Sequence, residues 1–313
     1  MRVHDPLIRP RMIAAMVCAS FLFIYGCELA TPSLRNMAPD YGFPTQDGFA
    51  GELNGGVSDG EGMGGNGPEG EEGNDWPEMN GYWRVEHFTT LRSELPVIME
   101  EVETQVRATL IMEVTQDLDQ LWFHHQICDV NMTNTPAYNQ TIIPDSFVNA
   151  LPLKTRRAQL LKVPDTEPSA YRLNVPVWHD LRSVILSDPS QDALPIRKDD
   201  PRVYDQDQDG IPGLTARLVG FPEGEVSLIQ NSWDQWLGTV VLGESNLEKN
   251  RVASVEGEIV WDQSQAIIEA SNDVLLIEVR RWVAEDPELH YFEMQRIDQL
   301  QCPPRRDQPR PSQ

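Results

Sequence analysis

The sequence predicts an all-β protein, mainly an antiparallel barrel or sandwich with one or two short helices, preceded by a disordered tether. Three observations support this fold class. The 313 residues include 24 prolines and 21 glycines, which disfavour a mostly helical chain. Apolar and polar side chains alternate along many short segments after about residue 81, the period of a half-buried strand. Turn residues fill most gaps between these segments, as in antiparallel barrels and sandwiches.

The charge balance excludes two classes of partner. Forty-nine acidic against 25 basic side chains give a formal net charge of −24. A nucleic-acid-binding protein needs clustered Lys and Arg to neutralise phosphates. Electrostatic docking on anionic lipid needs the same excess of positive charge. We therefore expect no nucleic-acid partner and no charge-driven attachment to lipid.

Residues 1–27 are expected to be a signal peptide. Arg2, Arg9 and Arg11 outnumber the single acid Asp5, and the apolar run 12–26 follows them. A membrane-spanning helix needs about 20 apolar residues, so this run is short for a span and fits the apolar region of a signal peptide.

The end of the apolar run, Ile24-Tyr25-Gly26-Cys27, resembles a bacterial lipobox. The resemblance implies that Cys27 becomes the diacylated N-terminus of the mature protein, and that the membrane is its partner through this lipid anchor. Tyr25 departs from the small residue that the family prefers. Glu28, where Asp would favour inner-membrane retention, implies the outer membrane. An ordinary secretory peptide cut near Ala30 and an uncleaved anchor remain alternatives.

Residues 28–80 are expected to form a disordered acidic tether. They contain twelve glycines, eleven acids and one base, Arg35, without hydrophobic periodicity. Such a chain cannot bury enough apolar surface to offset its ordering entropy. It would span roughly 40 Å as a flexible spacer.

Residues 81–302 are expected to form the β-rich globular domain, followed by a disordered tail at 303–313. We expect strands at 83–91, 106–114, 121–130, 157–163, 171–186, 214–219, 225–236, 239–242, 252–261, 266–270 and 289–297. Turn residues occupy 221–224, 236–238 and 262–264, and short helices are expected at 96–103 and 145–150. Residues 274–284 fit a helix, although 276–283 also alternate like a strand.

Two cysteines remain in the mature domain. Cys18 leaves with the signal peptide and Cys27 carries lipid, so Cys128 and Cys302 are left. An even pair in an oxidising compartment predicts a disulfide, with two unpaired thiols as the alternative.

A calcium loop is the most specific chemical prediction. Asp205, Asp207 and Asp209 stand at alternate positions and are followed by Gly210, as at the start of an EF-hand loop. Ca²⁺ takes six to eight oxygen ligands, and a loop wrapped around it turns alternate residues inward. The backbone carbonyl of Ile211 is placed to be the next ligand.

The rest of the loop departs from the EF-hand pattern. Its twelfth position is Ala216 in place of a bidentate glutamate, so Asp200, Asp199 or Asp192 would have to complete the shell. Over residues 205–210 the chain resembles the calcium loops of thrombospondin type-3 repeats and dockerins. A solvated acidic turn is the alternative interpretation.

Two wider resemblances follow. The lipobox, the acidic spacer, Asn149-Ala150-Leu151-Pro152, the D-x-D-x-D-G-x-P-G turn and the late cysteine together resemble uncharacterised lipoproteins of myxobacteria, a family without an established activity. Gly81-Tyr82-Trp83 is similar to the G-x-W of lipocalins. That resemblance implies that a basic residue of the last strand, Arg296, packs over Trp83.

The sequence therefore predicts an exported, outer-membrane lipid-anchored envelope protein, a non-catalytic binding or structural module stabilised by a Ca²⁺ loop. A lipocalin-like carrier of a small apolar ligand is the first alternative, and it requires a hollow barrel. A hydrolase is the second, and it requires a convergent nucleophile and base. Trp122, Trp178, Trp233, Trp236, Trp261 and Trp282 are expected to fill the core or line a barrel mouth.

Overall fold

The computed structural model describes residues 76–95, 100–166, 170–243, 250–277 and 279–304. The predicted signal peptide, most of the predicted tether and residues 305–313 lie outside these ranges. None of the helices in the described ranges has the length and apolar character needed to cross a bilayer.

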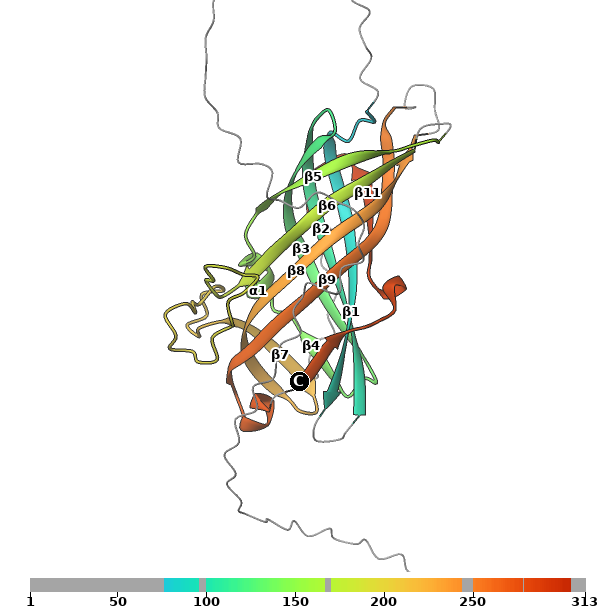
Figure 1. Ribbon diagram of the computed structural model, residues 1–313. Helices are drawn as coiled ribbons and strands as arrows, with labels where there is room; N and C mark the ends of the chain where they lie inside the picture. The colour runs from blue at the N-terminus through green and yellow to red at the C-terminus, as the bar shows by residue number, and fades with distance from the viewer. Residues whose placement is uncertain (1–75, 96–99, 167–169, 244–249, 278, 305–313) are drawn as a thin grey trace, which may run out of the picture. The chain divides into compact units, whose positions relative to one another are not determined.

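Eleven strands form one sheet with antiparallel pairings between neighbouring strands, which confirms the all-β fold class (Figure 1). The strands are β1 (Gly81–Leu95), β2 (Glu100–Asp117), β3 (Gln120–Thr135), β4 (Asn139–Ile142), β5 (Lys154–Val163), β6 (Ala170–Arg182), β7 (Leu214–Gly220), β8 (Gly224–Leu242), β9 (Val252–Ala270), β10 (Arg280–Val283) and β11 (Tyr291–Ile297). One α-helix, α1 (Asp145–Asn149), and two 3₁₀ turns, η3 (Asp273–Leu276) and η4 (Pro287–Leu289), complete the described elements.

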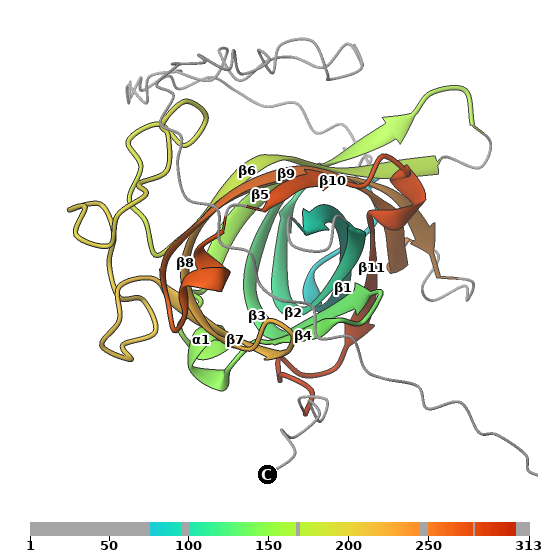
Figure 2. The ribbon, with the colours of Figure 1, turned by 90° about the horizontal axis from the view of Figure 1, so that it is seen from below.

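The sheet closes on itself and forms a barrel. The pairing runs β8-β6-β5-β3-β2-β1-β11-β9, and β9 pairs again with β8 from Leu242↔Val252 to Val226↔Ala270. Figure 2, viewed along the barrel, shows these strands encircling a central space. Each strand of this ring is therefore hydrogen-bonded to a neighbour on both sides over at least part of its length.

Different strands complete the wall of the barrel at its two ends. β5 and β6 separate β3 from β8 at one end, which we name the packed end and which is uppermost in Figure 1. β7, bonded to β4, adjoins β8 at the opposite end, which we name the hollow end. Likewise β1 pairs with β11 over 82–88 and with β10 over 91–94.

Large apolar side chains fill the packed end. Trp83, Phe123 and Phe292 are fully buried there, together with Met79 from just before β1. Residues 76–80, expected to belong to the tether, therefore include a side chain of the core.

Arg296 covers Trp83 at this end, as the lipocalin resemblance implied. Its guanidinium carbon lies 4.6 Å from the centre of the Trp83 ring. The same group donates hydrogen bonds to the backbone carbonyls of Val252, Asn80 and Glu78. Arg296 thereby links β11 to β9 on one side and to the residues just before β1 on the other.

The predicted disulfide is present. Cys128 of β3 and Cys302, which follows β11, are bonded with their Cα atoms 5.4 Å apart and 174 residues apart in sequence. Since β11 pairs with β1 and β9, the bond fixes the chain beyond the last strand to a more distant part of the ring.

Two predicted turns are wrong. Residues 236–238 and 262–264 lie inside the continuous strands β8 and β9. Gly238 is directly opposite Gly257, and a Cβ atom on Gly238 would lie 2.6 Å from a methyl carbon of Val255. Gly238 is therefore needed because a side chain at this position would collide with the neighbouring strand.

Two predicted helices also differ. Residues 274–284 form the end of η3 and then β10, because hydrogen bonds to β1 stabilise the extended form. Residues 100–103, expected in the first helix, belong to β2, whereas the helix expected at 145–150 is present as α1.

Candidate functional site: a charged cavity inside the barrel

The hollow end encloses a cavity of about 320 Å³. One side of its lining is apolar, because β1, β2 and β3 turn aliphatic side chains inward there. These side chains are Leu91, Val102, Val106, Ala108, Leu110, Ile127, Val130 and Met132. Ile143 and Phe147, from before and within α1, extend the same apolar surface.

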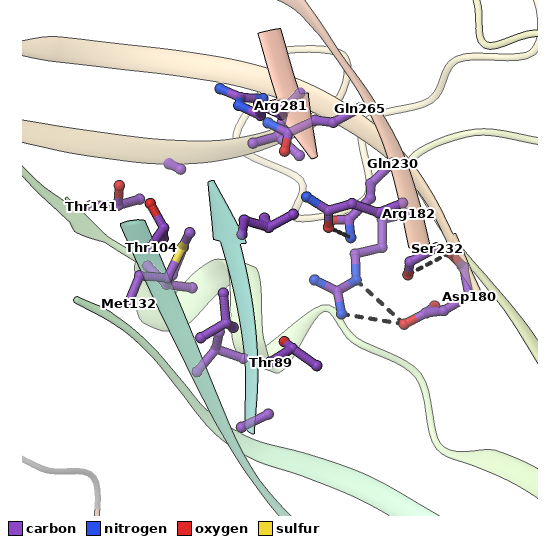
Figure 3. Close-up of a pocket in the computed structure, with 18 of the residues that line it drawn as sticks. Thr89, Thr104, Met132, Thr141, Asp180, Arg182, Gln230, Ser232, Gln265 and Arg281 are labelled. Carbon is purple, nitrogen blue, oxygen red and sulfur yellow. Dashed lines mark hydrogen bonds and ion pairs between the residues drawn. The ribbon is translucent and has the colours of Figure 1, made fainter. Parts of the chain in front are cut away.

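All the charged side chains of the described lining come from the opposite side, from β5, β6, β8 and β10, where apolar side chains of β8 and β9 also line the cavity. Figure 3 shows Asp180, Arg182, Ser232 and Gln230 facing Met132 and the threonines across the cavity. The charges are thus confined to one side of the cavity. Trp178, Trp233, Trp236 and Trp261 also line it, which confirms the expectation for these four tryptophans.

A buried ion pair lies at the inner limit of the cavity. The Arg156 guanidinium is 2.7 Å from a carboxylate oxygen of Asp234, and it stacks on the Trp236 ring at 5.0 Å. Trp236 donates its indole N–H to the other Asp234 oxygen, at 3.0 Å, and His87 Nε2 lies 3.6 Å from it. Burial would raise the pKa of Asp234, but the charge of Arg156 and contacts with His87 outweigh it and lower the pKa.

A second carboxylate, Asp180, holds two cations. Lys154 donates to one of its oxygens, and the Nε and Nη2 atoms of Arg182 lie 3.4 and 3.3 Å from the other. Burial opposes ionisation of Asp180, yet the charges of Arg182 and Lys154 lower its pKa. Desolvation lowers the pKa of Lys154. This cluster carries one positive charge in excess.

His125 of β3 is buried beside these charges. Desolvation, with the nearby charges of Arg156 and Lys154, lowers its pKa from 6.5 to about 4. Its Nδ1 atom has no hydrogen-bond partner in the described part of the chain. The adjacent His124 faces the other side of the strand and contacts the Thr155 hydroxyl at 3.0 Å. The two rings therefore do not form a common metal site.

Arg281 of β10 is the fourth cation of the cavity. Within the described ranges, its guanidinium has neither a hydrogen bond nor an ion pair. Its side chain lines the cavity and remains accessible to solvent. The surrounding protein nevertheless removes part of its hydration, and this desolvation lowers the pKa of Arg281. An arginine stays protonated under such conditions.

A side opening adjoins the cavity between β9 and β10. Residues on both strands border it, and Leu91, Gln263, Gln265, Val279 and Arg281 line the opening as well as the cavity. His290 accepts hydrogen bonds from the backbone N–H of Thr90 and the indole N–H of Trp261, which joins β1 to β9. Arg281 therefore lies at the junction of the cavity and this opening.

The geometry offers little for nucleophilic catalysis. Such chemistry needs a hydroxyl or thiol within hydrogen-bond reach of a base. Among the described lining residues, no hydroxyl hydrogen-bonds to His87 or His125, and the Ser232 hydroxyl points to the backbone carbonyl of Asp180 at 3.5 Å.

The predicted metal loop forms a separate group, in the long connection between β6 and β7. Asp205, Asp207 and Asp209 each place a carboxylate oxygen within 4.8 Å of the others. One oxygen of each is already hydrogen-bonded: Gly210 N–H of the loop donates to Asp205, while Thr215 at the start of β7 donates its N–H to Asp207 and its hydroxyl to Asp209. One oxygen of Asp205 and one of Asp207 are buried without a hydrogen-bond donor in the described ranges.

Burial raises the pKa of Asp207, and the neighbouring charges of Asp209 and Asp205 act in the same direction. The cluster can therefore accept a cation, since repulsion among its carboxylates is otherwise uncompensated.

The other residues predicted to complete the shell are placed differently. Asp200 accepts hydrogen bonds from the backbone and guanidinium of Arg202 and is not part of the cluster. Asp199 pairs with Arg197, and Asp192 accepts from the backbone at Ser187. The N–H of Ile211 donates to Asp209, which keeps that residue beside the cluster.

The charged residues of the cavity were missed in the sequence. A signal was present: Lys154 and Arg156, and likewise Asp180 and Arg182, stand two residues apart and therefore share one face of a strand. Alternation alone does not say which face is internal, because that depends on pairing with distant strands.

Comparison with protein-family models, with curated proteins and with solved structures finds no match for this chain. Its function is therefore argued from its own geometry.

We expect His125 to destabilise the protein in mild acid. Between pH 6.5 and about 4 the unfolded chain binds a proton at this residue that the folded chain does not, so the free energy of unfolding falls as the pH falls. The loss approaches about 3 kcal/mol at the lower limit of this window. Urea unfolding at a series of pH values should show this loss in the wild type and a much smaller one in His125→Phe. His124→Phe, on the outer face of the same strand, should behave like the wild type; equal acid sensitivity in all three would contradict the prediction.

Proposed function

We propose that this protein is a lipid-anchored envelope protein whose barrel binds a small, largely apolar ligand without transforming it. The observation that carries the proposal is the hollow end of the barrel. Its cavity of about 320 Å³ lies at the lower limit of the range of about 300–1,000 Å³ typical of ligand pockets.

The contrast between the two ends supports a binding role. At the packed end the same strands fill the interior with Trp83, Phe123 and Phe292. At the hollow end some inward positions hold small side chains, such as Ala108 and Ala216, and the larger side chains around them leave the space open. Protein interiors are normally close-packed, so an interior space of this size favours an occupant over a purely structural role.

Binding without catalysis is favoured by the contacts of the polar groups. Asp234 and Asp180 are each paired with cations. Among the described lining residues, no hydroxyl forms a hydrogen bond with His87 or His125. The polar groups of the described lining form ion pairs with one another, and none is paired as nucleophile and base.

The cavity is tested by filling it. Ala108→Phe places a ring in the space that the ligand would occupy, so the affinity for the uncharged fluorescent probe N-phenyl-1-naphthylamine should fall about tenfold or more. Ala253→Phe adds the same ring at an exposed position of β9 and should bind the probe like the wild type.

A second filling variant, Val106→Trp, keeps the test valid if Ala108→Phe does not fold. Circular dichroism should show both filled variants to be folded. Wild-type protein that fails to bind the probe, or filled variants that bind it normally, would refute a ligand in the barrel.

The loop at residues 205–211 is proposed to bind Ca²⁺ as a structural ion. All its donors are oxygens, which suit a hard cation, and two of them are buried without a donor. Bound Ca²⁺ would stiffen the connection between β6 and β7, which Gln206 fastens to the backbone at Ser183 and Ala150.

Millimolar Ca²⁺ should raise the melting temperature. With an affinity of about 10⁻⁴ to 10⁻³ M, as in extracellular calcium modules, 10 mM Ca²⁺ would stabilise the fold by roughly 1–3 kcal/mol. The effect should disappear in Asp207→Asn and persist in Asp199→Asn, whose carboxylate is exposed and paired with Arg197. Calorimetry without heat of binding and without a thermal shift would show that the loop is a solvated acidic turn.

The membrane anchor is proposed from the lipobox-like segment ending at Cys27, which lies outside the described residues. An acidic spacer after the anchor and a disulfide in the domain both accord with an exported protein.

Radiolabelled palmitate should be incorporated into the wild-type protein expressed in a bacterium, and the label should sediment with the outer membrane. Cys27→Ser should incorporate none, whereas Cys18→Ser, within the predicted signal peptide, should be labelled normally. A wild type without label would exclude the lipid anchor.

A further inference from the structure

We propose that the cavity selects amphipathic acids, and that Arg281 holds their anionic head group at the junction of the cavity and the side opening. This inference rests on the proposed function, because it assigns the chemistry of the ligand that the barrel binds. It depends on three observations: the charge of the lining, the free guanidinium of Arg281, and the confinement of the charged residues to the side of the cavity opposite the aliphatic side chains of β1, β2 and β3.

The lining is positive inside a strongly negative protein. Its described residues include four fixed cations, Lys154, Arg156, Arg182 and Arg281, and two carboxylates, Asp180 and Asp234. The whole chain has a formal net charge of −24. A neutral ligand would leave the excess positive charge in this confined space without a partner, whereas one anionic group would compensate much of it.

The cations differ in what already binds them. Arg156 is paired with Asp234, and Lys154 shares Asp180 with Arg182. Arg182 uses its Nε and Nη2 atoms on Asp180, so Nη1 remains for another acceptor within the described structure. Arg281 has all of its donors available among the described residues, and a guanidinium binds a carboxylate or phosphate through two parallel hydrogen bonds.

The position of Arg281 matches an amphipathic ligand. β10 turns Arg281 into the cavity beside the opening, while Gln265 of β9 lines the same junction (Figure 3). The apolar surface formed by β1, β2 and β3 lies across the cavity, where Met132 is labelled. A ligand with its head group at Arg281 can therefore place its apolar body against that surface.

Arg280, the neighbouring residue, supplies a matched control. It is exposed, and its guanidinium packs over the Trp282 ring at 5.4 Å. It carries the same charge on the same strand and borders the side opening, but it does not line the main cavity. A variant at Arg280 changes the net charge of the protein as a variant at Arg281 does.

The test compares decanoate with decan-1-ol, which share an alkyl chain and differ in charge. Each is used to displace N-phenyl-1-naphthylamine from the wild type, Arg281→Gln and Arg280→Gln near pH 7. We expect the wild type and Arg280→Gln to prefer decanoate by about tenfold or more, the effect of one charge-assisted contact. In Arg281→Gln this preference should largely disappear, while the affinity for decan-1-ol and for the probe is retained.

The outcomes separate the two proposals. If the probe binds but decanoate shows no advantage over decan-1-ol, or if Arg281→Gln keeps the full preference, the assignment of an acidic ligand to Arg281 is overturned and the apolar cavity stands. If the probe itself does not bind the wild type, the proposed function fails and this inference fails with it. Arg281→Lys, which keeps the charge without the planar fork, should restore part of the preference.

Discussion

The pairing of β8 with β9 along almost their whole length is the constraint on which the interior depends. It closes the path β8-β6-β5-β3-β2-β1-β11-β9 into a ring, so apolar and charged side chains that face inward are surrounded by strands, except beside the side opening. The close approach of Gly238 and Gly257 lets these strands pass without a Cβ atom between them at the packed end. Closure in turn fixes the volume that side chains must fill, and the residues of the hollow end do not fill it.

Enclosure also explains the arrangement of the charges. A charged group removed from water is tolerated when a counter-charge and hydrogen bonds replace the lost solvation. Asp234 forms an ion pair with Arg156, and Asp180 forms ion pairs with both Lys154 and Arg182. His125, beside these cations, is held neutral by its lowered pKa. The unsatisfied charge is thus concentrated toward the side opening, where water and solutes reach it.

The parts predicted from the sequence are those that local pattern determines. Alternation located most strands, the local spacing of Asp205, Asp207 and Asp209 located the carboxylate cluster, and the count of cysteines located the disulfide. The cavity was offered only as an alternative, because its lining comes from strands far apart in the chain. Whether Asp180 faces inward depends on register with β8, which is a non-local property.

Arg281 shows this limit most clearly. The segment around it satisfies a helical period and a strand period at once, and local reasoning chose the helix. Pairing with β1 stabilises the strand, and in this strand Arg281 lines the cavity. Similarly, Gly238 fits a turn by composition, but its neighbours across the sheet, Val255 and Phe292, give the reason for a glycine there.

The one-sided bonding of β10 has a consequence for exchange with the surroundings. β10 is four residues long and pairs with β1, and no pairing with β9 is present in the described ranges. Its release breaks a short ladder and leaves the closed ring intact, so it belongs to the least protected class of local opening. For a ligand bound as proposed, fraying of this short segment would govern the residence time, and substitutions there would change it without altering the global stability that the ring and the disulfide provide.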